Sequence, residues 1–252
     1  MKRAFLNLLL FSMATGSIFG EDPAPGRQVE QSIDFEGGGS MGYLLWLPND
    51  YGKEEGRRWP VVLFLHGRGE SYGPLSLVAK WGPPQMAARG DDLPYIIVSP
   101  QCPRESDWRR EDQQKGVMTL LEDILEKYSG DADRVYLTGL SMGGYGSWRL
   151  AADHPDRFAA VIPICGGGNP EDGEKLVRVP IWVFHGTEDS AVPLRLSEEM
   201  VEAVRRAGGD RIRFTVLEHI GHNSWSAAYA TPELYQWMEA QTRAESAGEG
   251  AE

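Results

Sequence analysis

Four short polar segments contain the residue types that nucleophilic catalysis requires, and each comes shortly after an apolar run. In chain order they are 66–70, Ser141, 185–189 with its carboxylates and 218–223 with its histidines. A serine hydroxyl becomes a good nucleophile when an imidazole accepts its proton, and that imidazole needs a carboxylate to fix its tautomer and stabilise its charged form. The sequence therefore offers a serine, an acid and a base, in that order, for acyl transfer.

Ser141 lies in the stretch GLSMG at 139–143, between an apolar run at 135–138 and a helix-like segment. This context predicts a nucleophile elbow, a sharp strand-to-helix turn that exposes the serine hydroxyl above a sheet. Glycines are needed on both sides because a Cβ there would strike neighbouring backbone. Ser147 and Ser190 lack such glycines, so we predict ordinary surface or capping positions for them.

The elements that must position these residues alternate along the chain from residue 61 onward. Apolar runs followed by helical patterns predict parallel strands joined by crossover helices. The runs VVLFL, YIIV, VYLT and IWVF are apolar without alternation, as expected for strands covered on both faces. We predict strands at 29–36, 43–48, 61–65, 95–99, 135–138, 159–164, 181–184 and 212–217, and helices near 75–88, 113–128, 194–207 and 227–242, besides the one that follows Ser141.

The predicted fold class is α/β, with a mostly parallel central sheet of about eight strands and helices on both faces. In such sheets ligands bind at the carboxyl ends of the strands, which is where the four polar segments fall. No linker interrupts the middle of the chain, so we expect a single domain over 21–243.

With these segments in place, the chain resembles an α/β-hydrolase of the dienelactone hydrolase, polyhydroxybutyrate depolymerase-like and feruloyl esterase group. The resemblance spans roughly residues 30–240 and rests on LFLHGRGE, LTGLSMGGYGSW, VFHGTEDSAVP and GHNSW, in that order. It implies an α/β-hydrolase fold and a serine carboxylic-ester hydrolase that forms an acyl-enzyme on Ser141. The motifs are much less specific for substrate: export, an acidic surface and tryptophans in loops are compatible with carbohydrate-linked feruloyl or acetyl esters and equally with small soluble esters.

The resemblance also implies roles for the acid and the base. The acid corresponds to Asp189, with Glu188 as the runner-up, and the base corresponds to His222. His219 competes for the role of base, but it lies nearer the body of the last strand. His66 and His185 each precede a glycine at a strand end, where we expect an orienting hydrogen bond.

An oxyanion hole requires main-chain donors. We expect the backbone N–H of Met142 to be one, and the resemblance gives Arg68 as the second, with Gly67 next. Two tryptophans are predicted to contact substrate: Trp108 because it lies in a long loop after a strand end, and Trp225 because it flanks the base.

Composition limits the partners. The formal net charge is −12, so a nucleic-acid backbone would be repelled and we exclude nucleic acid. The histidines fall in separate segments without metal-ligand spacing, and the glycines at 166–168 do not form a nucleotide-binding pattern, so we expect neither a metal nor a cofactor. Cys102 and Cys165 follow strands separated by two others, so we do not expect a disulfide between them.

The ends of the chain carry their own signals. Residues 1–20 have two basic residues, an apolar run and then small residues, which predicts a secretory signal peptide and a secreted or periplasmic protein. The apolar run is shorter than the ~20 residues that a spanning helix needs, so we expect no stable membrane insertion after its removal. Residues 244–252 are polar and acidic, which predicts a disordered tail.

Two alternatives remain for the function. The same order of serine, acid and base occurs in prolyl-oligopeptidase-type serine peptidases, although nothing here resembles an extra domain that would gate peptides. A binding module that uses the fold without catalysis is the other alternative, because a fold alone does not establish activity.

Overall fold

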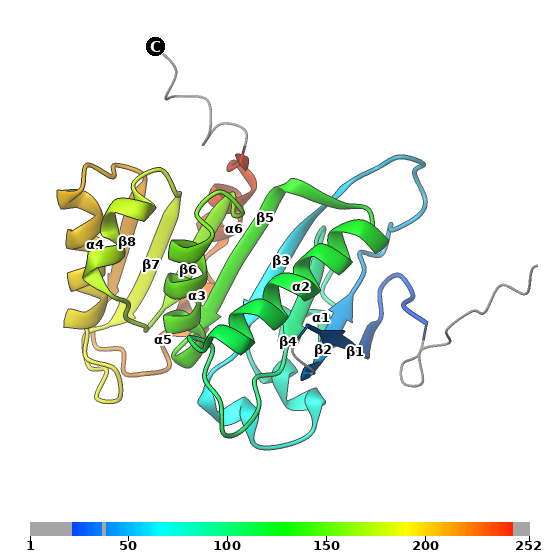
Figure 1. Cartoon of the computed structure of the whole chain (residues 1–252), viewed down its shortest axis with the longest axis horizontal. Helices are drawn as coiled ribbons and strands as arrows, with labels where there is room; N and C mark the ends of the chain where they lie inside the picture. Colours follow the sequence, from blue (N-terminus) through cyan, green and yellow to red (C-terminus); the bar gives the residue numbers. More distant parts are fainter. Residues whose placement is uncertain (1–21, 37–38, 244–252) are drawn as a thin grey trace, which may run out of the picture.

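One sheet of eight strands organises the computed structural model, which describes residues 22–36 and 39–243 (Figure 1). The strands are β1 (Gln28–Phe35), β2 (Gly39–Trp46), β3 (Trp59–Leu65), β4 (Ile96–Pro100), β5 (Gly130–Leu140), β6 (Ala160–Ile164), β7 (Ile181–Gly186) and β8 (Ile212–Leu217). Their order across the sheet is β1-β2-β4-β3-β5-β6-β7-β8. Strand β2 pairs antiparallel with β1 and β4, and every other pair is parallel. The predicted mostly parallel sheet is confirmed.

Helices cover both faces of this sheet (Figure 1). The α-helices are α1 (Gly82–Ala88), α2 (Glu111–Lys127), α3 (Met142–Asp153), α4 (Arg195–Arg206), α5 (Ser224–Tyr229) and α6 (Pro232–Glu239). The 3₁₀ helices are η1 (Arg68–Ser71), η2 (Leu75–Lys80) and η3 (Pro170–Leu176). Buried side chains of α2, α3 and α4 pack in one core layer, and those of α1, α5 and α6 pack in the other.

Strand β3 shows why the central strands are apolar throughout. Val61, Leu63 and Leu65 point into one core layer, whereas Val62 and Phe64 point into the other. All five side chains are at most 2% exposed. Because successive side chains of a strand face opposite sides, a sheet covered on both faces requires apolar residues at every position.

Two helices predicted as continuous are broken. The segment 75–88 forms η2 and α1, because the chain turns at Gly82, whose φ of +65° is accessible to glycine at little cost. The segment 227–242 divides into α5 and α6, with Pro232 at the first position of α6. A proline ring cannot continue a helix but is well suited to start one. Both breaks shape the surroundings of the site described below.

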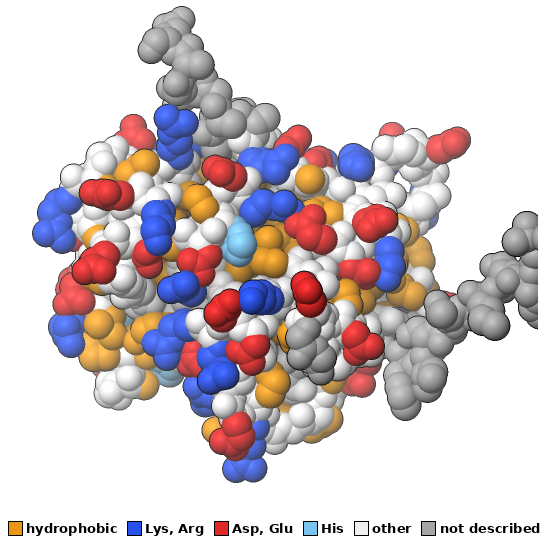
Figure 2. Space-filling view, in the orientation of Figure 1, with side chains coloured by type: hydrophobic (Ala, Val, Ile, Leu, Met, Phe, Trp, Pro, Cys, Tyr) orange, Lys and Arg blue, Asp and Glu red, His pale blue; other side chains and the backbone are white. Residues whose placement is uncertain are grey.

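The described surface has no area dominated by one sign of charge on the face shown in Figure 2, where acidic and basic side chains are interspersed. Within residues 22–36 and 39–243, no helix is both long and apolar enough to span a membrane. The predicted signal peptide at 1–20 and the predicted acidic tail at 244–252 lie outside the described residues.

Candidate active site

Ser141 occupies the sharp turn between β5 and α3. Its backbone has φ 54° and ψ −115°, a conformation that residues with side chains rarely adopt. A Cβ on Gly139 would lie 2.4 Å from the carbonyl oxygen of Gly143, and a Cβ on Gly143 would lie 1.8 Å from that of Leu65. Both glycines are therefore sterically required, because the chain on either side of Ser141 packs backbone against backbone.

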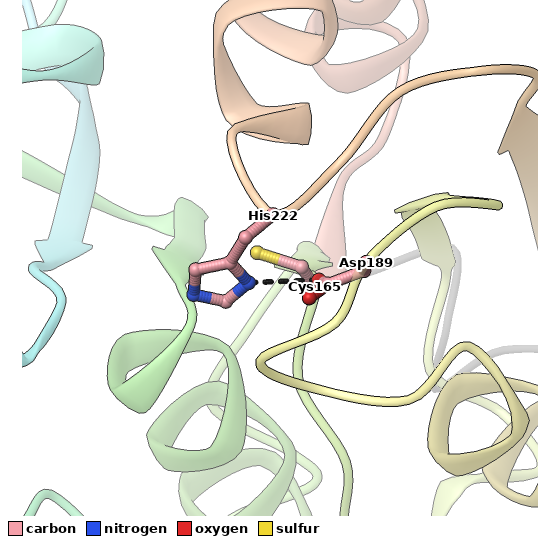
Figure 3. Close-up of side chains that lie close together, drawn as sticks. All are labelled: Cys165, Asp189 and His222. Atoms are coloured by element: carbon pink, nitrogen blue, oxygen red, sulfur yellow. Dashed lines mark hydrogen bonds and ion pairs between the residues drawn. The ribbon is translucent and has the colours of Figure 1, made fainter.

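The Ser141 hydroxyl begins a chain of hydrogen bonds that ends at a buried carboxylate. Ser141 Oγ lies 2.9 Å from Nε2 of His222. Nδ1 of His222 lies 2.7 Å from Oδ2 of Asp189, the bond drawn in Figure 3. The Asp189 side chain is fully buried, whereas that of His222 is 28% exposed. Oδ1 of Asp189 accepts the amide N–H groups of Ala191 and Val192 at 2.9 and 2.8 Å. The fixed carboxylate accepts Nδ1–H of His222, which leaves Nε2 to accept the serine proton.

A second histidine contacts the same carboxylate from the protein interior. His185, near the end of β7, is fully buried, and its Nε2 lies 3.3 Å from Oδ2 of Asp189 and 2.9 Å from the carbonyl oxygen of Val192. Its Nδ1 lies 2.8 Å from Oγ of Ser197, which donates to the carbonyl oxygen of Gly166. Both neighbours of Nε2 are acceptors, so Nε2 carries a proton. The predicted orienting hydrogen bonds of His185 are confirmed, but its contact with the acid was not foreseen.

The turn after β3 is held by the imidazole of His66. This ring is buried, with Nδ1 2.6 Å from the carbonyl oxygen of Gly67, and its Nε2 accepts the amide N–H of Cys102 at 2.9 Å. Burial lowers the pKa of His66 to about 4, so the ring is neutral at neutral pH and its proton is on Nδ1. The C=O of Gly67 and the N–H of Arg68 belong to one planar, trans peptide group and point in opposite directions. The bond to His66 therefore directs the Arg68 N–H away from the imidazole.

Glu70, which the sequence analysis did not single out, engages the other amide of this turn. Its carboxyl group is buried, and burial raises its pKa above the usual value. It accepts hydrogen bonds from the backbone N–H of Gly67 and from the indole of Trp81. The backbone N–H groups of Arg68 and Met142, by contrast, have no acceptor within the described chain. The geometry thus favours Arg68 over Gly67 as the second oxyanion donor.

The two tryptophans predicted to contact substrate have different surroundings. Trp108 is completely buried, its indole N–H donates to the carbonyl oxygen of His66 at 2.9 Å, and its ring packs edge-on against the His66 ring. The prediction of a substrate contact for Trp108 is wrong, because its loop folds back and places the indole beneath the turn after β3. Trp225 is half-buried, with its ring centroid 5.3 Å from that of His222.

The alternative acid and base pair with each other at the surface. Nδ1 of His219 lies 3.1 Å from Oε1 of Glu188, and their side chains are 87% and 62% exposed. Neither side chain is hydrogen-bonded to Ser141 in the described part of the chain. The geometry therefore brings together Ser141, Asp189 and His222 and leaves the alternatives outside.

Both cysteines are free, as expected, and buried. Burial raises the pKa of each thiol to about 12. Cys165 follows β6, and its sulfur lies beside the Asp189–His222 pair in Figure 3. Its Sγ and one ligand atom each of Asp189 and His222 lie within 4.8 Å of one another. A metal ion there would have to break the bond between Asp189 and His222 and deprotonate a buried thiol, so this set suits proton transfer better than metal binding.

Comparisons with known proteins agree with this geometry. The sequence model of the family Esterase, described as "Putative esterase", matches residues 36–245. Feruloyl esterase B of Thermothelomyces thermophilus is 30% identical over 113 residues, which cover 40% of this chain and 37% of that protein. The bifunctional acetylxylan esterase/xylanase XynS20E of Neocallimastix patriciarum is 26% identical over 183 residues, which cover 62% of this chain and 25% of that protein.

A solved structure supports the same assignment. The crystal structure of a thermostable esterase matches with a TM-score of 0.72 and 33% identity, covering 85% of this chain and 63% of that one. The chain spans 25% and 37% of the lengths of the two curated relatives. The family match, in contrast, extends over most of this chain. The chain therefore belongs to the esterase family and has the α/β-hydrolase fold.

Proposed function

We propose that this protein is a serine carboxylic-ester hydrolase in which Ser141 is the nucleophile, His222 the general base and Asp189 the acid that orients it. The unbroken hydrogen-bond chain from Ser141 Oγ to the buried Asp189 carboxylate is the observation that carries this proposal. The backbone amides of Met142 and Arg68, which have no acceptor in the described chain, support it as the oxyanion hole.

Acylation follows from this geometry. Ser141 Oγ attacks the ester carbonyl carbon while its proton moves to Nε2 of His222, and the carbonyl oxygen becomes an oxyanion that accepts the two backbone N–H groups. The C–O bond to the alcohol then breaks, and the leaving oxygen takes the proton from Nε2. The products of this half-reaction are the free alcohol and an ester of Ser141.

Deacylation repeats the same steps with water. A water molecule gives a proton to Nε2 of His222 and its oxygen attacks the acyl carbon. The bond to Ser141 Oγ breaks, the proton on Nε2 returns to Oγ, and the carboxylic acid leaves. His222 thus acts as base and then as acid in each half-reaction, while Asp189 stabilises its charged form.

We further propose carbohydrate-linked acetyl or feruloyl esters as the substrates. The names of the two curated relatives, a feruloyl esterase and an acetylxylan esterase/xylanase, support this class. Export from the cell fits such substrates, and the pattern at 1–20 supports export. Amino-terminal sequencing of protein recovered outside the cytoplasm tests export, because a start near residue 21 is expected and a start at Met1 contradicts it.

The activity is tested by comparing wild type with Ser141→Ala on short p-nitrophenyl esters and methyl ferulate. We expect turnover by wild type and loss of about 10⁴-fold or more in the variant, since the variant keeps the oxyanion donors but has no nucleophile. Equal rates in both proteins would contradict the assignment of Ser141. Casein and a proline-containing peptide serve as controls: cleavage of these in place of esters would support a peptidase, and no turnover of any substrate by folded wild type would support a binding module.

A further inference from the structure

A groove of about 270 Å³ lies between α1 and α5, adjacent to the catalytic base. Trp225 connects the groove to the base, because it lines the groove and its ring packs edge-on against His222 at an interplanar angle of 88°. Trp81 also lines the groove and packs beside Trp225, with the two ring centroids 5.8 Å apart and the ring planes inclined at 59°. Two indoles therefore stand where the groove begins, beside the imidazole that handles the proton.

The position beside His222 determines which half of an ester the groove can receive. In the proposed reaction Nε2 of His222 gives its proton to the leaving oxygen, so the alcohol departs along the side of the site that His222 occupies. The wall of that side continues from His222 through Trp225 to Trp81. The groove is thus adjacent to the alcohol of the ester.

The rim of the groove beyond the indoles is polar. Gln85 donates its amide N–H to the carbonyl oxygen of Lys80 at 2.7 Å, and Ser226 donates its hydroxyl to Asn223 at 2.7 Å. These bonds leave the side-chain carbonyl oxygen of Gln85 and a lone pair of Ser226 as acceptors within the described chain. Arg89 contributes further N–H donors.

The two basic side chains at the rim have different partners. The guanidinium of Arg89 lies 3.1 Å from the carboxylate of Asp91, and the ammonium of Lys80 lies 5.2 Å from the centre of the Trp81 ring. The groove therefore combines aromatic side chains with both donors and acceptors. A neutral sugar has this combination in complementary form, with an apolar C–H face and a rim of hydroxyl groups that donate and accept.

We propose that the groove between α1 and α5 binds the alcohol half of the ester, and that this alcohol is a neutral sugar residue stacked on Trp81 and Trp225 and hydrogen-bonded to Gln85, Arg89 and Ser226. The proposal rests on the proposed esterase function. It assigns alcohol specificity to α1 and α5, which the sequence analysis predicted as parts of two longer helices.

The test compares two esters with the same acyl group, an acetylated xylo-oligosaccharide and methyl acetate. Both give the same acetyl-enzyme, so the ratio of their kcat/KM values depends on the alcohol alone. We expect Gln85→Ala and Trp81→Leu to lower the ratio of sugar ester to methyl ester by about 10- to 100-fold, the effect of losing one or two polar or stacking contacts. Trp81→Phe, which keeps a flat ring, should restore part of the ratio.

A second groove provides the matched control. It has a volume of about 240 Å³, is lined by Arg58 and Trp59, and lies at the amino end of β3, away from Ser141. The indole of Trp59 is only 3% exposed and is covered by the guanidinium of Arg57, so it offers no open face. We expect Arg58→Ala to leave the ratio unchanged.

The outcomes separate the two proposals. Hydrolysis of both esters by wild type, with ratios unchanged in Gln85→Ala and Trp81→Leu, would overturn the sugar groove and leave the esterase function standing. Hydrolysis of neither of these esters, nor of methyl ferulate or the p-nitrophenyl esters, by folded wild type would overturn the esterase function and the groove with it. Any effect that Trp81→Leu has on the turn after β3, through Glu70, acts on the hydrolysis of both esters. It therefore cancels in the ratio of their kcat/KM values.

Discussion

Nε2 of His185 lies 3.3 Å from Oδ2 of Asp189, the same carboxylate oxygen that contacts His222 at 2.7 Å. The carboxylate is therefore held from two sides, by the partly exposed imidazole of His222 toward solvent and by the buried imidazole of His185 toward the core. With two amide N–H groups on its other oxygen, Asp189 has a fixed orientation before any substrate binds. Such preorganisation is what a proton-transfer site requires.

We expect loss of His185 to affect turnover more than substrate binding. His185→Leu removes the polar N–H that lies 3.3 Å from the Asp189 carboxylate and should lower kcat by about 10- to 100-fold with little change in KM, because Asp189 loses a polar neighbour that helps to fix it. His185→Gln, whose amide N–H reaches a similar position, should recover part of the rate. Steady-state kinetics on a short ester measure both, and thermal unfolding reports the accompanying loss of stability. A KM effect without a kcat effect would contradict the positioning role.

Substituting Asp189 and Glu188 separately tests which of the two carboxylates orients His222. Asp189→Asn should lower kcat by about 10⁴-fold, because an amide cannot stabilise the imidazolium of His222 and favours the wrong tautomer. Glu188→Gln should stay close to wild type, since among the described residues its carboxylate pairs with the exposed His219. The reverse result, an active Asp189→Asn and an inactive Glu188→Gln, would move the acid to Glu188.

The elbow predicts a large difference between two glycine substitutions. Gly143→Ala would put a Cβ 1.8 Å from the carbonyl oxygen of Leu65, so β3 and α3 must separate. We expect a loss of about 4 kcal/mol or more in the free energy of unfolding, or failure to fold. Gly69→Ala meets no atom within 4 Å and has no positive φ, so a change within about 0.5 kcal/mol is expected. Urea unfolding of both variants measures the contrast, and equal stabilities would refute the steric argument.

The two cysteine thiols are expected to react slowly while the protein is folded. Cys102 and Cys165 are free and buried, and their raised pKa values of about 12 keep them protonated near pH 8. We expect no rapid reaction of the folded protein with Ellman's reagent, and two thiols per chain after unfolding in guanidinium without reductant. A count near zero after unfolding would show that the cysteines are bridged.

The fold could be predicted because its central strands carry their own signal. Val61 to Leu65 are apolar on both sides, and the polar segments come where parallel strands end, so the sheet and the approximate positions of Ser141, Asp189 and His222 follow from local patterns. The acid and base needed the family resemblance as well, since Glu188 and His219 are chemically equivalent alternatives. Their exclusion comes from the three-dimensional arrangement, which pairs them with each other.

What the sequence could not predict depends on contacts between distant segments. Trp108 lies in a loop, yet that loop folds onto His66 and buries the indole completely. Glu70 resembles any surface glutamate until the Gly67 amide and the Trp81 indole are placed around it. The break between η2 and α1 is a different case: Trp81 is extended, Gly82 has a positive φ, and Pro83 and Pro84 follow, so the sequence did carry a signal for this break that the helical prediction over 75–88 passed over.

The buried imidazole of His66 predicts how the stability of the fold depends on pH. Its pKa is about 4 in the folded protein against 6.5 for an exposed histidine, mainly because of burial. Between these values the unfolded chain binds a proton at this ring that the folded chain does not bind. The free energy of unfolding is therefore at its full value above pH 6.5. It decreases as the pH falls from 6.5 to the folded pKa of about 4. At about 1.4 kcal/mol per pKa unit, the whole window corresponds to about 3 kcal/mol of unfolding free energy.

Two measurements check this sign and size. Urea unfolding between pH 7.5 and 4.5 should give a steeper loss of stability for wild type than for His66→Gln, which has no ring to protonate. NMR titration of the histidine rings should show the His66 signals unchanged down to about pH 5, as expected for a ring with a pKa of about 4. A ring that titrates near 6.5 would contradict the bond from Cys102, because a protonated imidazole cannot accept the amide N–H of Cys102 at Nε2.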